Sequence, residues 1–269
     1  MNVYHYTSLD AVRGILRNKD ICLWGTRYDS LNDPTDCIYA EEDILPEFKE
    51  FLKEKSVNEN ELEDIKIYPY VVSFSRIEDD FNMWRMYKAE IAIEFDAEVI
   101  KNMVDAKQEK NSIASQDELF WGECKYPKGK KEKRQAFVEL YNTTSSTDKP
   151  VIEAREILPL IKRPEFANEN EYRLYAFDCN LAVGDGENAR ECEVPHNIHT
   201  KCIQNKDFIL YKEFHLPVNS LKGFIINVRD DAYFEKVKSH LELILLSSNI
   251  MKKMNIRKTR NGQNINLNI

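Results

Sequence analysis

The sequence predicts a single α+β domain, and three observations support this class. The chain has 269 residues, of which 42% are hydrophobic and 11% aromatic, which is enough apolar material for a sizeable core and too much for a disordered chain. Segments that alternate with a period of two are interspersed with segments whose apolar residues recur at helical spacing. No internal repeat, low-complexity block or strong linker interrupts them. We therefore expect one domain over residues 1–269, with a basic C-terminal tail from about residue 252.

Each element follows from periodicity and from its end signals. In the first helix, for example, Thr7 and Ser8 supply an N-cap, and Leu9, Val12 and Ile15 recur on one face. The expected elements are, in order, a strand at residues 3–6, a helix at 9–16, an extended segment at 21–24, a polar turn at 28–34, a helical segment at 41–67, a strand at 70–75, a linker at 82–87, a strand at 90–96, an unassigned region at 101–127, helices at 130–141 and 150–160, a strand at 170–177, a loop at 179–205, strands within 216–227 and a helix at 232–246.

Composition limits the class of protein. The net charge of -8 argues against a surface devoted entirely to nucleic acid, although local basic patches remain compatible with it. No apolar stretch reaches the roughly 20 residues that span a bilayer, and the N-terminus lacks the pattern of a secretory signal. The six cysteines are scattered without a C-x-x-C pair, which is typical of reduced thiols. We therefore expect a cytoplasmic protein with no membrane partner.

Common nucleotide-binding and hydrolase motifs are missing. The sequence contains no P-loop, no dinucleotide-binding G-x-G-x-x-G, no G-x-S-x-G and no H-E-x-x-H. Four polar and aromatic clusters remain: His5-Tyr6-Thr7, Asn32-Asp33-Pro34, Ser73-Phe74-Ser75 followed by Trp84 and Tyr87, and Glu169-Asn170-Glu171-Tyr172-Arg173. Each has an ordinary alternative, namely a hydrogen-bonded histidine, core packing of the aromatic rings, or a solvated Glu171–Arg173 ion pair worth under about 1 kcal/mol.

The order of these clusters resembles a large bacterial family known only as a domain of unknown function. The pattern of that family runs H-Y-x-S, N-D-P, (C/S)-F-S, M-W-x-x-Y and F-x-x-E-x-E-(W/Y)-R. The matching segments here are His5-Tyr6-Thr7-Ser8, Asn32-Asp33-Pro34, Ser73-Phe74-Ser75, Met83-Trp84-Arg85-Met86-Tyr87 and the run from Phe166 to Arg173. The arrangement also looks like the ADP-ribosyltransferase fold, which implies a split mixed and antiparallel sheet with flanking helices.

That resemblance implies a role for each matching residue. His5 is expected to anchor the nicotinamide ribose of NAD, Ser75, Trp84 and Tyr87 to line the nicotinamide pocket, and Glu171 to be the catalytic glutamate. His5 and Tyr87 are also expected to take part in catalysis, although the central tyrosine of the pattern has no unambiguous position here. Further contacts with NAD are implied for Tyr6, Thr7, Asn32, Ser73 and Arg173.

The chemistry of glycosidic cleavage suits these residue types. Breaking the nicotinamide–ribose bond develops positive charge on the sugar, which a carboxylate stabilises, and aromatic rings can stack on nicotinamide. The NAD diphosphate requires donors, for which Arg13, Arg27 and Arg85 are candidates. Glu169 is expected on the strand face of Glu171, where it either shares the work of catalysis or solvates the loop.

Two basic runs and one Cys/His cluster have open interpretations. The runs are Lys125, Lys128, Lys130, Lys131, Lys133 and Arg134, and Lys252, Lys253, Arg257, Lys258 and Arg260. They either guide an RNA or DNA acceptor or form solvated helix faces and tails. Cys192, His196, His199 and Cys202 are chemically suitable zinc ligands, but a mobile loop without metal is the default interpretation because the spacing is unusual.

The leading hypothesis is an NAD-dependent ADP-ribosyltransferase that modifies a nucleic acid or a protein. By analogy with related transferases, it would be a bacterial toxin or anti-phage defence effector, with an antitoxin or accessory protein as a further partner. The alternatives are a non-catalytic nucleotide- or nucleic-acid-binding module of the same fold and an NAD glycohydrolase that uses water as acceptor.

Overall fold

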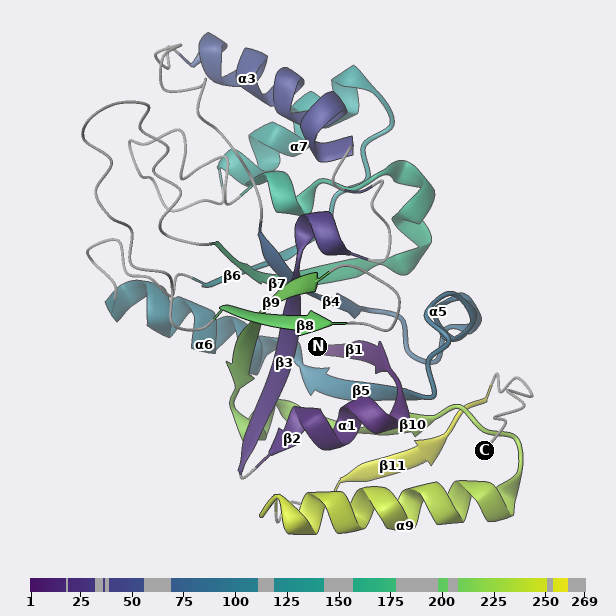
Figure 1. Cartoon of the computed structure of the whole chain (residues 1–269). Coiled ribbons are helices and arrows are strands. Elements are labelled where there is room, and N and C mark those ends of the chain that lie inside the picture. Colours follow the sequence, from purple (N-terminus) through teal and green to yellow (C-terminus); the bar gives the residue numbers. More distant parts are fainter. Residues whose placement is uncertain are drawn as a thin grey trace. The chain divides into compact units, whose positions relative to one another are not determined.

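The structure is a computed structural model that describes most of the chain. The described residues are 1–17, 19–31, 36, 39–55, 69–110, 119–142, 157–177, 198–202, 208–250 and 254–260. They form two compact units (Figure 1). Unit 1 combines the described parts of Met1–Leu23, Ser73–Ala106 and Phe214–Ile269, and unit 2 those of Trp24–Val72 and Lys107–Glu213. The single domain expected over the whole chain stays a prediction.

Helices and a mixed, mainly antiparallel sheet confirm the α+β class. The described strands are β1 (Asn2–Thr7), β2 (Leu16–Arg17), β3 (Asp20–Arg27), β4 (Tyr70–Ser75), β5 (Ile91–Asp96), β6 (Leu119–Glu123), β7 (Glu171–Ala176), β8 (Ile198–Cys202), β9 (Phe208–Leu216), β10 (Leu221–Ile226) and β11 (Asn255–Lys258). The described helices are α1 (Leu9–Ile15), η1 (Tyr28–Ser30), η2 (Ala40–Ile44), α3 (Leu45–Glu54), α5 (Phe81–Met86), α6 (Ala97–Lys110), α7 (Lys130–Tyr141), η3 (Leu158–Leu160), η4 (Pro164–Glu169), η5 (Val218–Ser220) and α9 (Asp231–Ser247). None of these helices is long and apolar enough to cross a bilayer.

Unit 1 is built around the strand sequence β11-β10-β5-β1. β1 pairs antiparallel with β5, β5 antiparallel with β10, and β10 parallel with β11. β5 is buried from Ile91 to Phe95, so the alternating pattern expected there belongs to a strand covered on both faces. Gly223 permits the parallel pairing, because a Cβ at this position would lie 2.2 Å from the carbonyl oxygen of Asn255.

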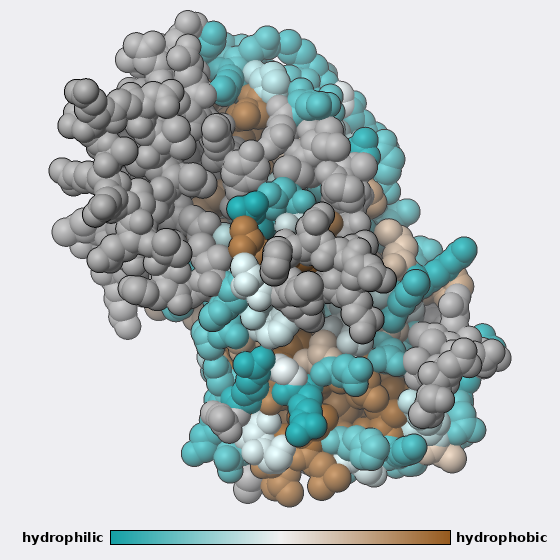
Figure 2. Space-filling view, in the orientation of Figure 1, coloured by the Kyte–Doolittle hydropathy of each residue, from teal (hydrophilic) through white to brown (hydrophobic). Residues whose placement is uncertain are grey.

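The helices of unit 1 begin at side-chain caps. Ser8 Oγ accepts from the Ala11 amide in α1, as the sequence predicts, and Asp80 Oδ1 accepts from the amides of Asn82 and Met83 in α5. Figure 1 shows α9 running beside β11, with Val237, Leu241 and Leu245 buried. Leu243 and Leu246 of α9 are exposed instead, and Figure 2 shows brown, hydrophobic atoms where Figure 1 draws this helix.

Unit 2 combines several antiparallel strand pairs with a helical pair. β3 pairs with β4 through Thr26 and Val71, β6 with β7, and β8 with β9. α3 packs against α7 (Figure 1), and rings from both helices meet, since Phe48 and Phe137 lie in an edge-on contact at 5.2 Å. The core of this unit gathers those rings with apolar residues of η3 and β7.

Four expectations for the elements are corrected. Residues 82–87, expected as a linker, belong mainly to helix α5, because Asp80 caps it. The expected loop at 179–205 contains strand β8, and Asn255–Lys258 of the expected basic tail form strand β11 beside β10. The unassigned region contains the end of α6 and strand β6.

Candidate functional site

Unit 2 contains five charged side chains in contact with one another and almost fully buried. We call them the buried charge cluster: Asp36, Lys162, Glu169, Glu171 and Arg173. Charged side chains are rarely buried to this degree unless they are paired. The cluster therefore distinguishes this part of unit 2 from its apolar core.

Lys162 lies at the centre of the cluster. Its Nζ is 2.6 Å from Glu169 Oε2, 2.6 Å from Glu171 Oε2 and 3.8 Å from Asp36 Oδ2. The backbone fixes its position, because the Lys162 amide donates to the carbonyl of Lys125 at 2.8 Å and the Lys125 amide donates to Leu160 at 2.7 Å. The parallel β-bridge between Lys125 and Ile161 thus positions the Lys162 ammonium group beside Glu169 and Glu171.

Glu169 and Glu171 reach the same ammonium group through a local turn. Glu169 ends the 3₁₀ helix η4, Glu171 begins β7, and Asn170 between them is left-handed at φ 48° and ψ 55°. Asparagine is one of the few residues other than glycine that adopts this conformation readily. Glu169 therefore lies outside the strand, contrary to the expectation that it would share the strand face of Glu171.

Arg173 holds the other side of Glu171. Its Nε donates to Glu171 Oε1 at 2.8 Å, its Nη2 to Asp36 Oδ2 at 2.8 Å, and its Nη1 to the carbonyl of Pro159 at 2.7 Å. The Arg173 side chain is 1% exposed and that of Glu171 3%. The solvated ion pair considered for these two residues is therefore excluded.

The cluster keeps Glu171 ionised. Burial alone would raise its pKa, but Arg173 and Lys162 outweigh burial and lower the pKa from 4.5 to about 2. For Glu169 burial dominates over the attraction of Lys162, and its pKa is raised. Neighbouring carboxylates with pKa values shifted in opposite directions form an arrangement common in active sites.

Two buried polar atoms beside the cluster lack a hydrogen-bond partner among the described residues: Asp36 Oδ1 and the Tyr28 hydroxyl. The Tyr28 ring faces Arg173, whose Cζ is 5.6 Å from the ring centroid, and burial raises the pKa of the phenol. One atom is an acceptor and the other can donate. Together they suit a ligand hydroxyl or a water molecule, because buried polar groups normally have partners.

Cys124 and Tyr126 form hydrogen bonds with the backbone of Glu171, the first residue of β7. The Glu171 amide donates to the Tyr126 hydroxyl at 2.8 Å, and the Cys124 amide donates to the Glu171 carbonyl at 2.9 Å. Burial raises the pKa of the Cys124 thiol, so this cysteine stays protonated and is a poor nucleophile. These contacts fix the backbone of Glu171.

In unit 1, the predicted clusters His5-Tyr6-Thr7 and Ser73-Phe74-Ser75 lie in contact. His5 Nδ1 lies 3.0 Å from the Ser73 carbonyl oxygen, which can only accept, so Nδ1 carries the hydrogen. Burial lowers the pKa of His5 and keeps the ring neutral. Ser75 Oγ accepts from the Ile77 amide at 3.1 Å. Thr7 ends β1, and its carbonyl accepts from Glu90.

The aromatic residues of unit 1 differ in exposure. Trp84 is 1% exposed, packs edge-on against Tyr6 with ring centroids 4.7 Å apart, and donates from Nε1 to Asp79 Oδ1 at 2.8 Å. Tyr6 donates to the Ile77 carbonyl at 2.9 Å. Tyr87, at the end of α5, is 39% exposed. The core-packing alternative therefore describes Trp84, which offers no ring face to a ligand here.

The predicted site residues fall into two groups. His5, Tyr6, Thr7, Ser73, Ser75, Trp84 and Tyr87 lie in unit 1, whereas Glu171 and Arg173 lie in unit 2. Asn32 lies outside the described residues. Contacts within each group are shown, and the predicted assembly of both groups around one NAD molecule stays a prediction.

Several described cations of the two basic runs have acidic partners. Lys130, Lys133 and Arg134 of α7 pair with Glu50, Glu47 and Glu54 of α3, so this run joins two helices. Arg257 pairs with Glu78 and Glu94, and Lys258 with Asp231. Lys252 and Lys253 lie outside the described residues. Contact with RNA or DNA stays a prediction, and these ion pairs compete with it.

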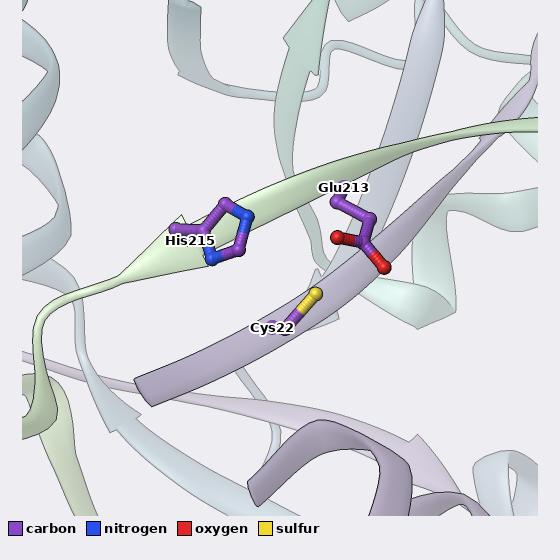
Figure 3. A group of neighbouring side chains, drawn as sticks. All are labelled: Cys22, Glu213 and His215. Carbon is purple, nitrogen blue, oxygen red and sulfur yellow. The ribbon is translucent and has the colours of Figure 1, made fainter. Parts of the chain in front are cut away.

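The group of potential metal ligands in the structure differs from the group that the sequence predicts. Cys192 and His196 lie outside the described residues, and His199 of β8 stacks on Tyr211 at 5.3 Å. Elsewhere in the described part of the chain, ligand atoms of Cys22, Glu213 and His215 lie within 4.8 Å of one another (Figure 3).

Sequence reasoning missed three members of these networks: Lys162, Asp36 and Asp79. Asp36 and Arg173 are 137 residues apart, and nothing in either segment indicates the other. Lys162 precedes Glu171 by only nine residues, but its role depends on the bridge to Lys125. Asp79 accepts from Trp84 of helix α5, and the N-cap residue Asp80 beside it is a sequence signal that could have indicated this helix.

Comparison with known proteins yields one family. The model described as "Protein of unknown function (DUF2971)" matches residues 83–174. The match begins at Met83 of the M-W-x-x-Y motif and ends at Leu174, directly after Arg173. No curated protein and no solved structure matches the chain, so the ADP-ribosyltransferase-like fold stays a prediction. The segment that matches this family model contains most of α5, all of β6 and α7, and most of β7.

Proposed function

We propose that this protein cleaves the nicotinamide–ribose bond of NAD and transfers ADP-ribose to an acceptor, with Glu171 as the catalytic carboxylate. The observation that carries the proposal is a carboxylate that stays ionised although it is buried, at the start of a strand and beside two polar atoms without a described partner. The resemblance of the motif series to ADP-ribosyltransferases supports the same assignment.

A fixed negative charge is what this reaction requires. The sugar becomes positively charged as nicotinamide leaves, and a preorganised carboxylate stabilises that charge without reorganising during the reaction. Lys162 and Arg173 keep Glu171 ionised and fix both of its oxygens. The ribose hydroxyls can both donate and accept, which matches Tyr28 and Asp36 Oδ1.

One observation favours a second candidate, the non-catalytic module that binds a nucleotide. Both oxygens of Glu171 are in ion pairs, and the residue is 2% exposed. A carboxylate held in this way can serve structure alone, because perturbed pKa values also occur in structural ion-pair networks. Catalysis in unit 2 therefore requires that the substrate reach the cluster and compete for Glu171.

The test is a measurement of nicotinamide release by the purified full chain from NAD labelled in the adenylate part. Protein and nucleic-acid fractions of a cell extract are then examined for retained label. Label on a fraction identifies transfer and its acceptor, whereas nicotinamide release without retained label identifies hydrolysis. The toxin, the defence context and an antitoxin partner are parts of the proposal that depend on this acceptor.

Glu171→Gln and Glu169→Gln form a matched pair of variants. Each removes one carboxylate that lies 2.6 Å from Lys162 Nζ and keeps the shape of the side chain. We expect nicotinamide release to fall by at least about 100-fold in Glu171→Gln, within the range for loss of a positioned catalytic group. Glu169→Gln should retain most activity. Full activity of a folded Glu171→Gln protein would refute the assignment, and ligand binding without any nicotinamide release would establish the second candidate.

A further inference from the structure

Strands β3 and β9 carry metal-ligating side chains at alternate positions. Asp20 and Cys22 are two residues apart on β3, and Glu213 and His215 are two residues apart on β9. Residues two apart lie on the same side of a strand. Figure 3 shows Cys22, Glu213 and His215 turned toward one another, with their ligand atoms within 4.8 Å.

Asp20 adds a second contact to this group. Its Oδ2 lies 2.5 Å from His215 Nδ1, and its Oδ1 accepts from the Ile21 amide at 2.9 Å. A histidine whose Nδ1–H donates to a carboxylate presents the lone pair of Nε2, and this carboxylate–histidine arrangement recurs behind metal-bound histidines. Asp20 therefore fixes the tautomer of His215 that suits a metal ligand.

The ligand atoms select the class of metal. A thiolate, an imidazole and a carboxylate form a set that favours Zn²⁺ over Mg²⁺ or Ca²⁺, which prefer oxygen alone. Bond lengths to zinc place such atoms about 3.5 Å apart in a tetrahedral site. Small side-chain adjustments would thus be sufficient to bring the ligand atoms from the observed spacing to that of a zinc site.

We propose that Cys22 and His215 bind a Zn²⁺ ion, with Asp20 positioning His215. These three residues all belong to unit 1, so the site requires only that unit. Glu213 is the residue of β9 directly before the unit boundary, and its carboxylate lies within 4.8 Å of the other two ligand atoms. The His215 side chain is 55% exposed, so the ion would have access from solvent and room for a bound water.

Metal binding is measured on the full chain after dialysis against a chelator. Zinc is titrated in competition with a chromophoric chelator, and Co²⁺ is added separately because a cobalt–thiolate bond has a characteristic near-ultraviolet charge-transfer absorption. We expect a single Zn²⁺ per chain with an apparent dissociation constant of about 1 µM or tighter. The melting temperature should rise with zinc concentration, because the ion binds only the folded state.

Three variants identify the site. Cys22→Ser should abolish the cobalt–thiolate absorption, and His215→Ala, at an exposed position, should weaken zinc binding by more than about 100-fold while the protein stays folded. Asp20→Asn should weaken binding by about 10–100-fold, as for other residues that orient a metal-bound histidine. The control is Cys124→Ser, which replaces a buried cysteine outside the proposed site and should leave the absorption unchanged.

The outcomes separate this site from other zinc-binding groups. Cobalt–thiolate absorption that persists in Cys22→Ser would overturn the proposal and point to another thiol, such as Cys192 or Cys202. Zinc affinity unaffected by His215→Ala, or weaker than about 100 µM in the wild type, would also overturn it. None of these measurements depends on NAD.

Discussion

Replacing Lys162 with methionine should destabilise the protein strongly, with a characteristic dependence on pH. The substitution keeps much of the side-chain length and removes the charge that lies 2.6 Å from both Glu169 and Glu171. Arg173 still pairs with Glu171, at 2.8 Å. Glu169 loses the ammonium group that lies 2.6 Å from its carboxylate, which stays buried.

The magnitude follows from this burial. Removing one partner of a buried ion pair costs about 3–5 kcal/mol, because the remaining charge is left uncompensated. For a chain of this size, that corresponds to a fall in melting temperature of roughly 6–20 °C. The same substitution at Lys130, whose ion pair with Glu50 is exposed, is the control and should change the stability far less.

The pH dependence identifies the cause. Burial already raises the pKa of Glu169, and loss of Lys162 raises it further. A carboxylate whose pKa is raised on folding contributes stability at low pH and loses it as pH rises through the folded pKa. The deficit of Lys162→Met should therefore shrink on mild acidification.

Urea unfolding at neutral and mildly acidic pH, followed by circular dichroism, measures these effects. The double variant Lys162→Met/Glu169→Gln should recover part of the loss at neutral pH, because the buried carboxylate that lost the Lys162 ammonium group is then replaced by a neutral amide. A cost below about 1 kcal/mol for Lys162→Met, or a deficit independent of pH, would refute the description of the cluster as buried and coupled.

Two further predictions concern acid stability and strand pairing. Because the pKa of Glu171 is lowered from 4.5 to about 2, this residue contributes about 3 kcal/mol of stability above pH 4.5, which is lost as pH falls toward about 2. The free energy of unfolding of Glu171→Gln should vary less across that interval than the wild type, and equal slopes would contradict the shift. Gly223→Ala should cost about 1–3 kcal/mol and accelerate amide exchange in β11, because its Cβ would meet the Asn255 carbonyl at 2.2 Å. Gly14→Ala, whose Cβ would have its nearest neighbour at 3.7 Å, is the control and should leave exchange in β11 unchanged.

Most elements could be predicted because their signals are local. β4 and α7 have the bounds expected from their patterns, and Ser8 caps α1 as expected. The errors have local causes as well. The segment at 82–87 is short and lacks a long apolar period, so its helix was missed, and β11 was read as a tail because its cations dominate its composition.

The candidate site was only partly predictable. The motif containing Glu171 and Arg173 indicated a site, but alternation along a strand does not reveal whether that face meets solvent or protein. Burial changes the meaning of this pair from a weak surface interaction to a strongly coupled cluster, since electrostatic interactions strengthen away from water. The interpretation of the basic run on α7 also depends on tertiary contacts, because its cations pair with glutamates of α3.

The sequence by itself determined the α+β class, most helices and strands, and the motif series whose last two motifs lie within the matched family segment. These features depend on periodicity, caps and short-range order, all of which are written in neighbouring residues. Only the tertiary structure decided that Lys162 and Arg173 converge on Glu171, that Asp36 pairs with Arg173, and that Asp20 orients His215. The physical reason is that long-range contacts depend on how the strands pair and on what is excluded from water, and no local pattern encodes either.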